Sequence, residues 1–159
     1  MNRRQPLAEV FGFHITDSSE KASRFRRDRL CPFNNKVPNC TKDKANAPLG
    51  VCSVFDQGRA IITCPIRFRE NWLITEQASR FFFPDGARWT SLTEVRLPEV
   101  NNGSAGNIDV VLVSYDTDGR ILDFGSLEIQ AVYISGNVRA PFEDFIERPE
   151  FWRELDWYQ

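Results

Sequence analysis

The chain has 159 residues, of which 42% are hydrophobic and 26% are charged, as is ordinary for one folded globular domain. Its formal net charge of −2 excludes a protein that is basic throughout. The charged N-terminus lacks a following apolar segment, and no apolar run approaches the length of a membrane span. We therefore expect a cytoplasmic protein with no membrane partner.

The charge is divided unevenly along the chain. Residues 1–80 hold 14 lysines and arginines against 8 acidic residues, a net charge of +6, whereas residues 81–159 hold 6 against 14, a net charge of −8. This division suits a protein that meets a polyanion with one surface and holds metal cations with another. Chance clustering of solvated charges gives the same pattern, so the charges alone do not decide the function.

The first third of the chain predicts little regular structure. Residues 8–15 are compatible with a short helix or a strand, and the basic run 24–29 contains Arg26 and Arg27, which are candidates for DNA phosphate contacts. A solvated helix face is the alternative interpretation of that run. The segment 31–65 is typical of loops, apart from a strand pair.

The expected elements then follow in chain order. The strand pair is residues 51–55 and 60–63, and a helix with an apolar face is expected over 70–83. The remaining predictions are an ordered segment at 92–97, a loop at 101–107, a buried strand at 108–114, a turn at 115–120, strands at 121–124 and 127–134 with a kink or bulge at Gly125, and a helix over 144–157 interrupted by Pro149.

Four cysteines occur in the loop-rich segment with the spacing C-x8-C-x11-C-x11-C: Cys31, Cys40, Cys52 and Cys64. In a cytosolic protein such a set favours metal ligands over disulfides, and four thiolates suit a closed tetrahedral structural site. Zinc and iron both fit four thiolates. Four separate buried thiols are the alternative, since free cysteines often pack as small hydrophobic groups.

Acidic side chains mark the two strands of the predicted second-half hairpin. Asp109 opens an apolar strand, and Glu128 and Gln130 lie two residues apart, so on a strand they would point to the same face. Two carboxylates there would bind Mg²⁺ in a metal-dependent nuclease, and Gln130 would orient a water without carrying charge. Glu94 is a further candidate carboxylate. An exposed polar sheet face is the alternative interpretation.

Together the cysteines and the Glu-x-Gln pair resemble NotI-like type II restriction endonucleases, over about residues 11–139. The stretches that carry the resemblance are NAPLGVCS (46–53), CPIRF (64–68), GNIDVVLV (106–113) and DFGSLEIQAVYISGNVR (123–139).

The resemblance implies an α/β fold with a PD-(D/E)xK core, in which helices flank a mixed sheet, plus a four-cysteine lobe that holds iron. It implies a homodimer that cleaves double-stranded DNA at a GC-rich palindrome with Mg²⁺, using Asp109, Glu128 and Gln130. It also makes Arg67 and Arg69 candidate DNA contacts. We expect a lobe over residues 1–70 and a partial catalytic core over residues 71–159, because family members are longer.

Two other functions stay open on the sequence. One is a non-catalytic nucleic-acid-binding module organised by the four cysteines, with a purely structural hairpin. The other is a different PD-(D/E)xK nuclease that acts without a strict palindrome. The single histidine, His14, counts against nucleases and zinc fingers that need more than one.

Overall fold

The computed structural model describes residues 7–34, 36–44, 46–99, 103–131 and 138–153. The chain forms two compact units: a first unit of Met1–Arg67 with Ala131–Gln159, and a second unit of Phe68–Gln130. Both units combine strands with helices, so the predicted mixture of α and β structure is confirmed. No helix in the described part of the chain is long and apolar enough to span a membrane.

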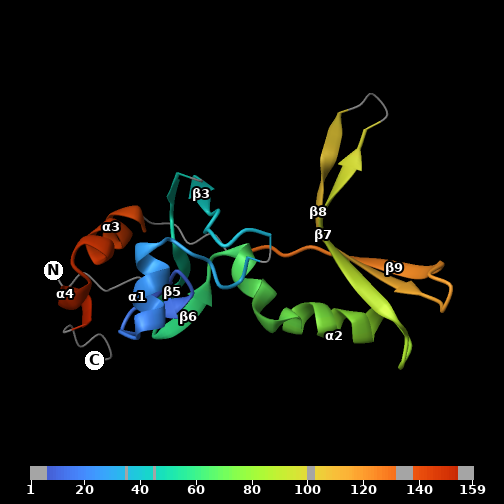
Figure 1. Cartoon of the computed structure of the whole chain (residues 1–159), viewed down its shortest axis with the longest axis horizontal. Helices are drawn as coiled ribbons and strands as arrows, with labels where there is room; N and C mark the ends of the chain where they lie inside the picture. The colour runs from blue at the N-terminus through green and yellow to red at the C-terminus, as the bar shows by residue number, and fades with distance from the viewer. Residues whose placement is uncertain (1–6, 35, 45, 100–102, 132–137, 154–159) are drawn as a thin grey trace. The chain divides into compact units, whose positions relative to one another are not determined.

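The first unit is built on a four-stranded sheet with the strand order β2-β1-β5-β6 (Figure 1). Its elements are β1 (Leu7–Val10), β2 (Phe13–His14), α1 (Glu20–Arg27), β3 (Asp43–Lys44), β4 (Ala47–Pro48), β5 (Val51–Asp56), β6 (Arg59–Ile62), α3 (Arg139–Glu147) and α4 (Pro149–Arg153). The predicted strand pair is confirmed as β5 and β6.

Residues 8–15, which the sequence predicted as either a short helix or a strand, belong to a tight hairpin of β1 and β2. Phe11 and Gly12 turn the chain with φ values of 51° and 83°, the left-handed conformation that two-residue hairpins require. The predicted C-terminal helix begins earlier than expected and divides into α3 and α4 before Pro149, and its last predicted residues, 154–157, lie outside the described residues.

The core of the first unit joins the two ends of the chain. Buried apolar side chains of the sheet pack with side chains of α3 and α4, and the fully or nearly fully buried set is Leu7, Val10, Phe11, Ile15, Val51, Val54, Phe142, Phe145 and Trp152. The C-terminal helices therefore pack with the N-terminal sheet. The sequence-based division into residues 1–70 and 71–159 remains a prediction about function.

The second unit is a three-stranded antiparallel sheet with the order β7-β8-β9, beside helix α2 (Figure 1). Its elements are α2 (Leu73–Phe82), β7 (Trp89–Pro98), β8 (Ser104–Tyr115) and β9 (Ile121–Leu127), and a 3-10 segment, Pro65–Trp72, leads into α2. All pairings between the described strands of both units are antiparallel, whereas the sequence analysis expected a mixed sheet. Short turns between successive strands favour this arrangement.

Three predicted boundaries in the second unit are wrong. The loop expected at 101–107 is partly strand, because β8 begins at Ser104 and pairs with the end of β7; residues 101 and 102 lie outside the described residues. The strand expected over 127–134 ends as β9 at Leu127, and residues 132–134 are likewise outside. Gly125 is no kink, because it pairs in register with Leu112 within β9.

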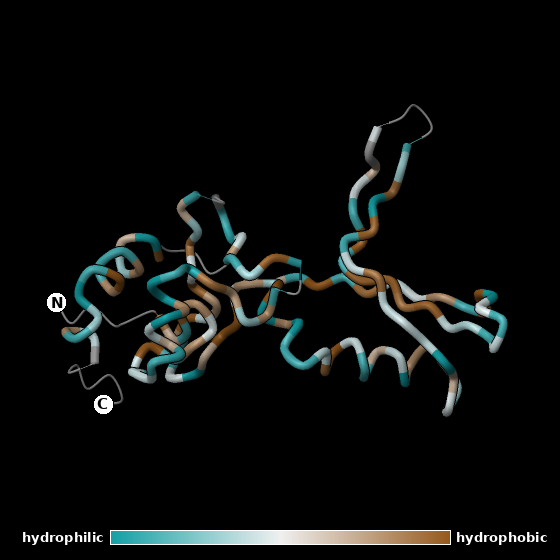
Figure 2. Tube along the Cα trace, in the orientation of Figure 1, coloured by the Kyte–Doolittle hydropathy of each residue, from teal (hydrophilic) through white to brown (hydrophobic). Residues whose placement is uncertain are grey.

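Helix α2 confirms the helix predicted over 70–83. The sequence predicted that its apolar face would be buried, but the most buried side chains of the helix are polar. Thr75 and Ser79 are buried, whereas Phe81 is 85% exposed. The ring of Phe82 packs directly on Gly125, where an added Cβ would lie 2.7 Å from three ring atoms. Figure 2 shows hydrophobic stretches on the paired part of this sheet, which α2 contacts through β8 and β9.

Gly125→Ala should destabilise the second unit, because the new methyl group overlaps the Phe82 ring and must displace it from the sheet. We expect a loss of about 1–3 kcal/mol in the free energy of unfolding, measured by urea denaturation. Ser126→Ala, at the exposed neighbouring position, is the matched control and should change stability by less than about 0.5 kcal/mol. Equal effects of the two substitutions would contradict this packing.

Candidate active site and cysteine cluster

Three of the predicted catalytic carboxylates lie in one row across the sheet of the second unit. The pairings on both sides of Glu94 keep a register in which it lies opposite Asp109. The register of β8 and β9, continued by one residue past the end of β9, places Glu128 opposite Asp109 on the other side. We call Glu94, Asp109 and Glu128 the carboxylate row. Its members come from three different strands or strand ends, and antiparallel pairing aligns their backbone positions across the sheet.

Just after the end of β9, the side chain of Asp109 replaces a backbone carbonyl as the hydrogen-bond acceptor for the next segment. Its Oδ2 accepts a hydrogen bond of 2.7 Å from the backbone N–H of Ile129. Ile129 lies between Glu128 and Gln130, so this bond fixes the Glu-x-Gln segment beside Asp109. A carboxylate in the place of a backbone acceptor also explains why the predicted strand stops here, since the main-chain ladder cannot continue past it.

Glu94 has an unusual backbone for a strand residue. Its φ is +54°, in the left-handed region that residues other than glycine rarely adopt. It stands where the part of the β7–β8 hairpin that pairs with β9 gives way to a two-stranded extension, and Figure 1 shows the hairpin bending sharply away from β9. Its carboxylate accepts a hydrogen bond of 2.9 Å from Arg69. Strained positions of this kind gather at functional sites.

The row is open to solvent on the side of Glu128 and Gln130, which are both exposed, while Asp109 is half-buried. Among the residues that the structure describes, no three or more His, Cys, Asp and Glu side chains gather closely enough to hold a metal ion. A magnesium site does not require such a cage, because Mg²⁺ is usually bound through one or two carboxylates together with waters and substrate phosphate. Asp109 and Glu128 remain the predicted ligands of such an ion.

The four cysteines belong to the first unit, and its backbone pairs them. An antiparallel bridge joins Leu30 to Asn39, and Cys31 and Cys40 lie diagonally across it, one on each side along the two chain segments. The backbone N–H of Cys40 donates to the carbonyl of Arg29 at 2.9 Å. At the open end of the β5–β6 hairpin, the N–H of Thr63 donates to the carbonyl of Cys52 at 3.0 Å. The hairpin thereby brings Cys52 close to Cys64. We call these four residues the cysteine cluster; as they lie in the described part of the chain, no three of them are close enough together to hold a metal ion.

Lys42 links the two cysteine pairs. Its ammonium group donates to the carbonyl oxygens of Val51 at 2.7 Å and Thr63 at 3.1 Å, which directly precede Cys52 and Cys64. Lys42 itself follows Cys40 by two residues. One half-buried cation thus ties together the backbone around three of the four cysteines.

The electrostatics of the thiols also connect all four. None of them forms a disulfide. Burial raises the pKa of the Cys40 thiol, the backbone N–H of Lys42 opposes this, and the neighbouring Cys31 and Cys64 raise it further. Burial likewise raises the pKa of Cys52 far above its ordinary value, Cys64 and Cys31 add to this, and the backbone N–H of Gly12 opposes it. Buried thiols close together need a cation to ionise together.

The β1–β2 turn closes over the cluster. A Cβ at Gly12 would lie 2.2 Å from the ring of Pro32, the residue that follows Cys31. The positive φ of Gly12 and this close approach both require glycine. The turn therefore contributes a backbone donor toward Cys52 and a surface against Pro32.

The four arginines predicted to contact DNA lie in different surroundings. Arg26 is buried, donates to the carbonyls of Asp17 and His14, and lies over the Phe145 ring. Arg67 donates to both carboxylate oxygens of Glu9 and stacks on Phe33. Arg27 is 71% exposed and pairs with Asp28. Arg69 is buried in the second unit.

These contacts give Arg26 and Arg67 a role in packing the first unit, and they leave Arg27 on the surface. DNA contacts by these side chains remain predictions. Arg67 and Arg69 were predicted together as DNA contacts, but they lie in different units, and the ion pair of Arg69 is with Glu94 of the carboxylate row.

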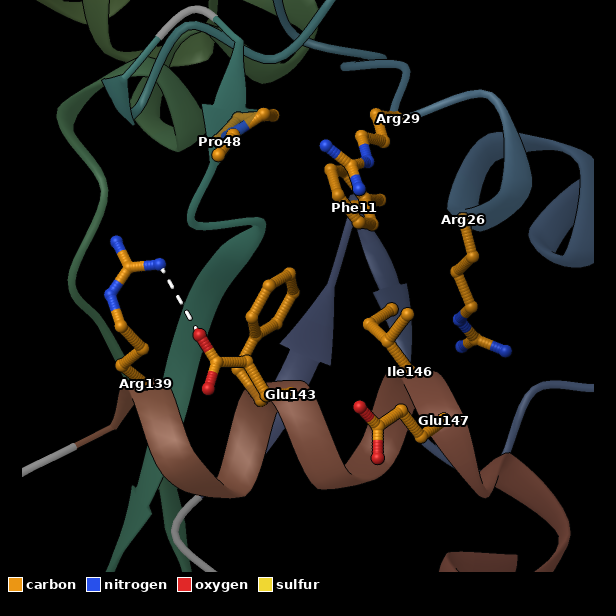
Figure 3. A pocket seen from close by; sticks show the side chains of 10 residues that line it. Phe11, Arg26, Arg29, Pro48, Arg139, Glu143, Ile146 and Glu147 are labelled. Atoms are coloured by element: carbon orange, nitrogen blue, oxygen red, sulfur yellow. Dashed lines mark ion pairs between the residues drawn. The ribbon is translucent and has the colours of Figure 1, made fainter.

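The first unit also contains a pocket of about 220 Å³ between α1, β4 and α3. Figure 3 shows Arg139 and Glu143 paired along α3, with Arg26 reaching in from α1. Arg29 donates to the carbonyl of Asn46, and Arg139 also pairs with Asp43. The pocket thus mixes charges of both signs, and none of the predicted catalytic residues lines it.

Lys42, Gly12 and Glu9 were not identified from the sequence. The Cys-x-Lys spacing of Cys40 and Lys42 was a visible signal, because it places a cation two residues from a thiol. The contributions of Gly12 and Glu9 depend on partners more than 20 residues away, so no local pattern revealed them.

Carboxylates of neighbouring strands, with a glutamine beside them, form a donor set of the class that holds a hard divalent cation for hydrolysis. The family model described as "Restriction endonuclease NotI" matches residues 9–157. The chain therefore belongs to the NotI restriction endonuclease family, a family of nucleases that bind and cleave DNA, as the sequence resemblance predicted. No curated protein matches the chain.

Lys42→Met should weaken the first unit, because two carbonyls around the cysteine cluster lose their charged donor. We expect a loss of about 1–3 kcal/mol in the free energy of unfolding, measured by urea denaturation of the protein as purified. Arg59→Met removes a charge from an exposed position on β6 and should change stability by less than about 0.5 kcal/mol. A stability of Lys42→Met equal to that of the control would show that the ammonium bonds are unimportant.

Proposed function

We propose that this protein is a type II restriction endonuclease that cleaves both strands of DNA in a Mg²⁺-dependent reaction. The observation that carries the proposal is the hydrogen bond from Ile129 to Asp109, which joins Asp109 to the Glu128-x-Gln130 segment. The membership of the chain in a restriction endonuclease family gives this arrangement its chemical meaning.

Asp109 and Glu128 would hold the metal ion. When bound, Mg²⁺ polarises the scissile phosphate and lowers the pKa of an attacking water. The amide of Gln130 can accept a hydrogen bond from that water and donate one to a phosphate oxygen, so it can orient the nucleophile. It cannot carry the positive charge of the lysine that usually occupies this place. Glu94 supplies a further carboxylate at the other end of the row.

The substrate that we propose is a GC-rich palindrome cut by a homodimer. A palindrome has a two-fold axis, and two copies of one chain related by such an axis present the same groups to both strands. The 16 arginines of the chain suit this substrate, because arginine forms paired hydrogen bonds with guanine. A single copy offers one carboxylate row, whereas double-strand cleavage needs one row for each strand.

The cysteine cluster supports a structural iron site of four thiolates, with zinc as the alternative. Its fit rests on the paired backbone of the four cysteines, their lack of disulfides and the N–H groups near Cys40 and Cys52. Backbone N–H groups that point at sulfur stabilise thiolates. A metal ion there would fold the loops of the first unit, and it has no open position for substrate.

Glu128→Ala and Asp109→Asn should each lower the rate of Mg²⁺-dependent cleavage of GC-rich double-stranded DNA on the order of 10⁴-fold, as expected for catalytic side chains. Binding of the same DNA in Ca²⁺ should persist, because the fold and the basic surfaces remain. Asp85→Asn is the matched control: Asp85 follows a proline in the second unit but lies in an exposed turn, and its loss should leave cleavage unchanged.

If the parent protein binds DNA without divalent metal ions and never cleaves it, the alternative of a non-catalytic nucleic-acid-binding module is correct. Cleavage at many unrelated sequences would instead favour a nuclease without a strict palindrome.

The protein purified in air should be red and contain about one iron atom per chain if the cysteine cluster holds iron. Substitution of any one of the four cysteines by serine should abolish the visible absorption, because each contributes one thiolate. Visible spectra and elemental analysis of the parent and the four variants measure this. A colourless protein with one zinc atom would replace iron by zinc, and a metal-free parent would contradict the metal site.

A further inference from the structure

The carboxylate row carries three negative charges, and the residue beside it, Gln130, is neutral. The chain has no lysine after Lys44 that could compensate. A phosphate approaching the row would add a further negative charge, so a cation of the protein at this place would favour both binding and cleavage. The arginines of the second unit are the candidates.

Arg69 differs from the other arginines of the second unit. Arg80, Arg88, Arg96 and Arg120 are all exposed, whereas the Arg69 side chain is only 7% exposed. Its Nη2 donates to Oε1 of Glu94 at 2.9 Å, and Glu94 itself is 44% exposed. A buried cation thus holds a carboxylate that faces solvent, which is unlike the exposed ion pair of Arg80 and Glu76 on α2.

The second terminal nitrogen of Arg69, Nη1, lacks a hydrogen-bond acceptor among the described residues. This nitrogen is also buried. A buried guanidinium donor without an acceptor is costly, and an acceptor supplied by a bound ligand would remove that cost.

The backbone on both sides of the pair is strained. Asn71 and Trp72 have φ values of 49° and 57°, and they reverse the chain directly after Arg69. Glu94 has a φ of 54° within β7. Glu94 is therefore held in a conformation that is unfavourable in isolation, and two such residues follow Arg69 after Glu70, as is typical of segments held for a function.

We propose that Arg69 is the phosphate-binding cation of this active site and takes over the charge that Gln130 lacks. Nη2 orients Glu94 within the carboxylate row, and Nη1 donates to a non-bridging oxygen of the scissile phosphate. The proposal rests on the proposed nuclease function and adds to it the residue that neutralises the phosphate. Arg67, two residues earlier, cannot serve in this way because Glu9 and Phe33 occupy its guanidinium.

Arg69→Gln tests the proposal in two measurements on the full chain. The single-turnover rate of cleavage of GC-rich duplex DNA in Mg²⁺ should fall about 100-fold. The slope of log K against log salt concentration for DNA binding in Ca²⁺ should decrease in magnitude by about 0.9, the value for one lost phosphate contact. Arg80→Gln, which removes an exposed arginine of the same unit, should leave the rate unchanged.

Arg69→Lys separates charge from geometry and gives a readout if Arg69→Gln fails to fold. Lysine keeps the charge but lacks the planar fork that bonds two partners at once. The salt slope should therefore stay at the parental value, while the cleavage rate falls about tenfold. Circular dichroism of each variant checks that the fold is retained.

The outcomes separate this inference from the nuclease proposal. If the parent cleaves DNA and both Arg69 variants keep its rate and its salt slope, Arg69 is only structural and the inference is wrong. If the parent binds but never cleaves DNA, the nuclease proposal fails, and an unchanged slope in Arg69→Gln then also rejects the phosphate contact. A parent that neither binds nor cleaves DNA contradicts both.

Discussion

The hydrogen bond between the Ile129 N–H and the Asp109 carboxylate is the constraint on which the site in the second unit depends. It ends the β8–β9 ladder by replacing a backbone acceptor with a side-chain oxygen. It also keeps the residues on either side of Ile129, Glu128 and Gln130, at the end of the sheet and open to solvent. A longer β9 would have bonded this segment into the ladder. The end of the strand and the position of the site therefore have one physical cause.

The second unit combines buried positive charge with exposed negative charge. Arg69 is buried and holds Glu94, whose carboxylate remains partly exposed. A related arrangement occurs in the first unit, where the half-buried ammonium of Lys42 fixes carbonyls beside two cysteines. In both places a cation organises groups that would otherwise repel one another or remain unsatisfied when buried. Such cations act through several partners at once, so their removal affects more than a single contact.

The first unit is built from both ends of the chain, an arrangement that the order of the elements along the sequence does not reveal. The N-terminal sheet gains its core from Phe142, Phe145 and Trp152, which follow the carboxylate row in the sequence. The second unit is thus an insertion between two parts of the first.

Local patterns in the sequence determined much of this protein. The hairpin of β5 and β6, helix α2, strand β8 and the turn after it all follow from apolar periodicity and turn residues, because these signals act over a few neighbours. The residues Glu94, Asp109 and Glu128 were also identified from the sequence, partly through the resemblance to the family.

Only the tertiary structure decided how these residues meet. The alignment of Glu94 with Asp109 depends on the register of two strands, and the pairing of Arg69 with Glu94 joins positions 25 residues apart. The end of β9, the packing of Phe82 on Gly125 and the bonds of Lys42 likewise arise from partners that are distant in the chain. Strand register and the burial of charge are properties of packed elements, so no local window of the sequence contains them.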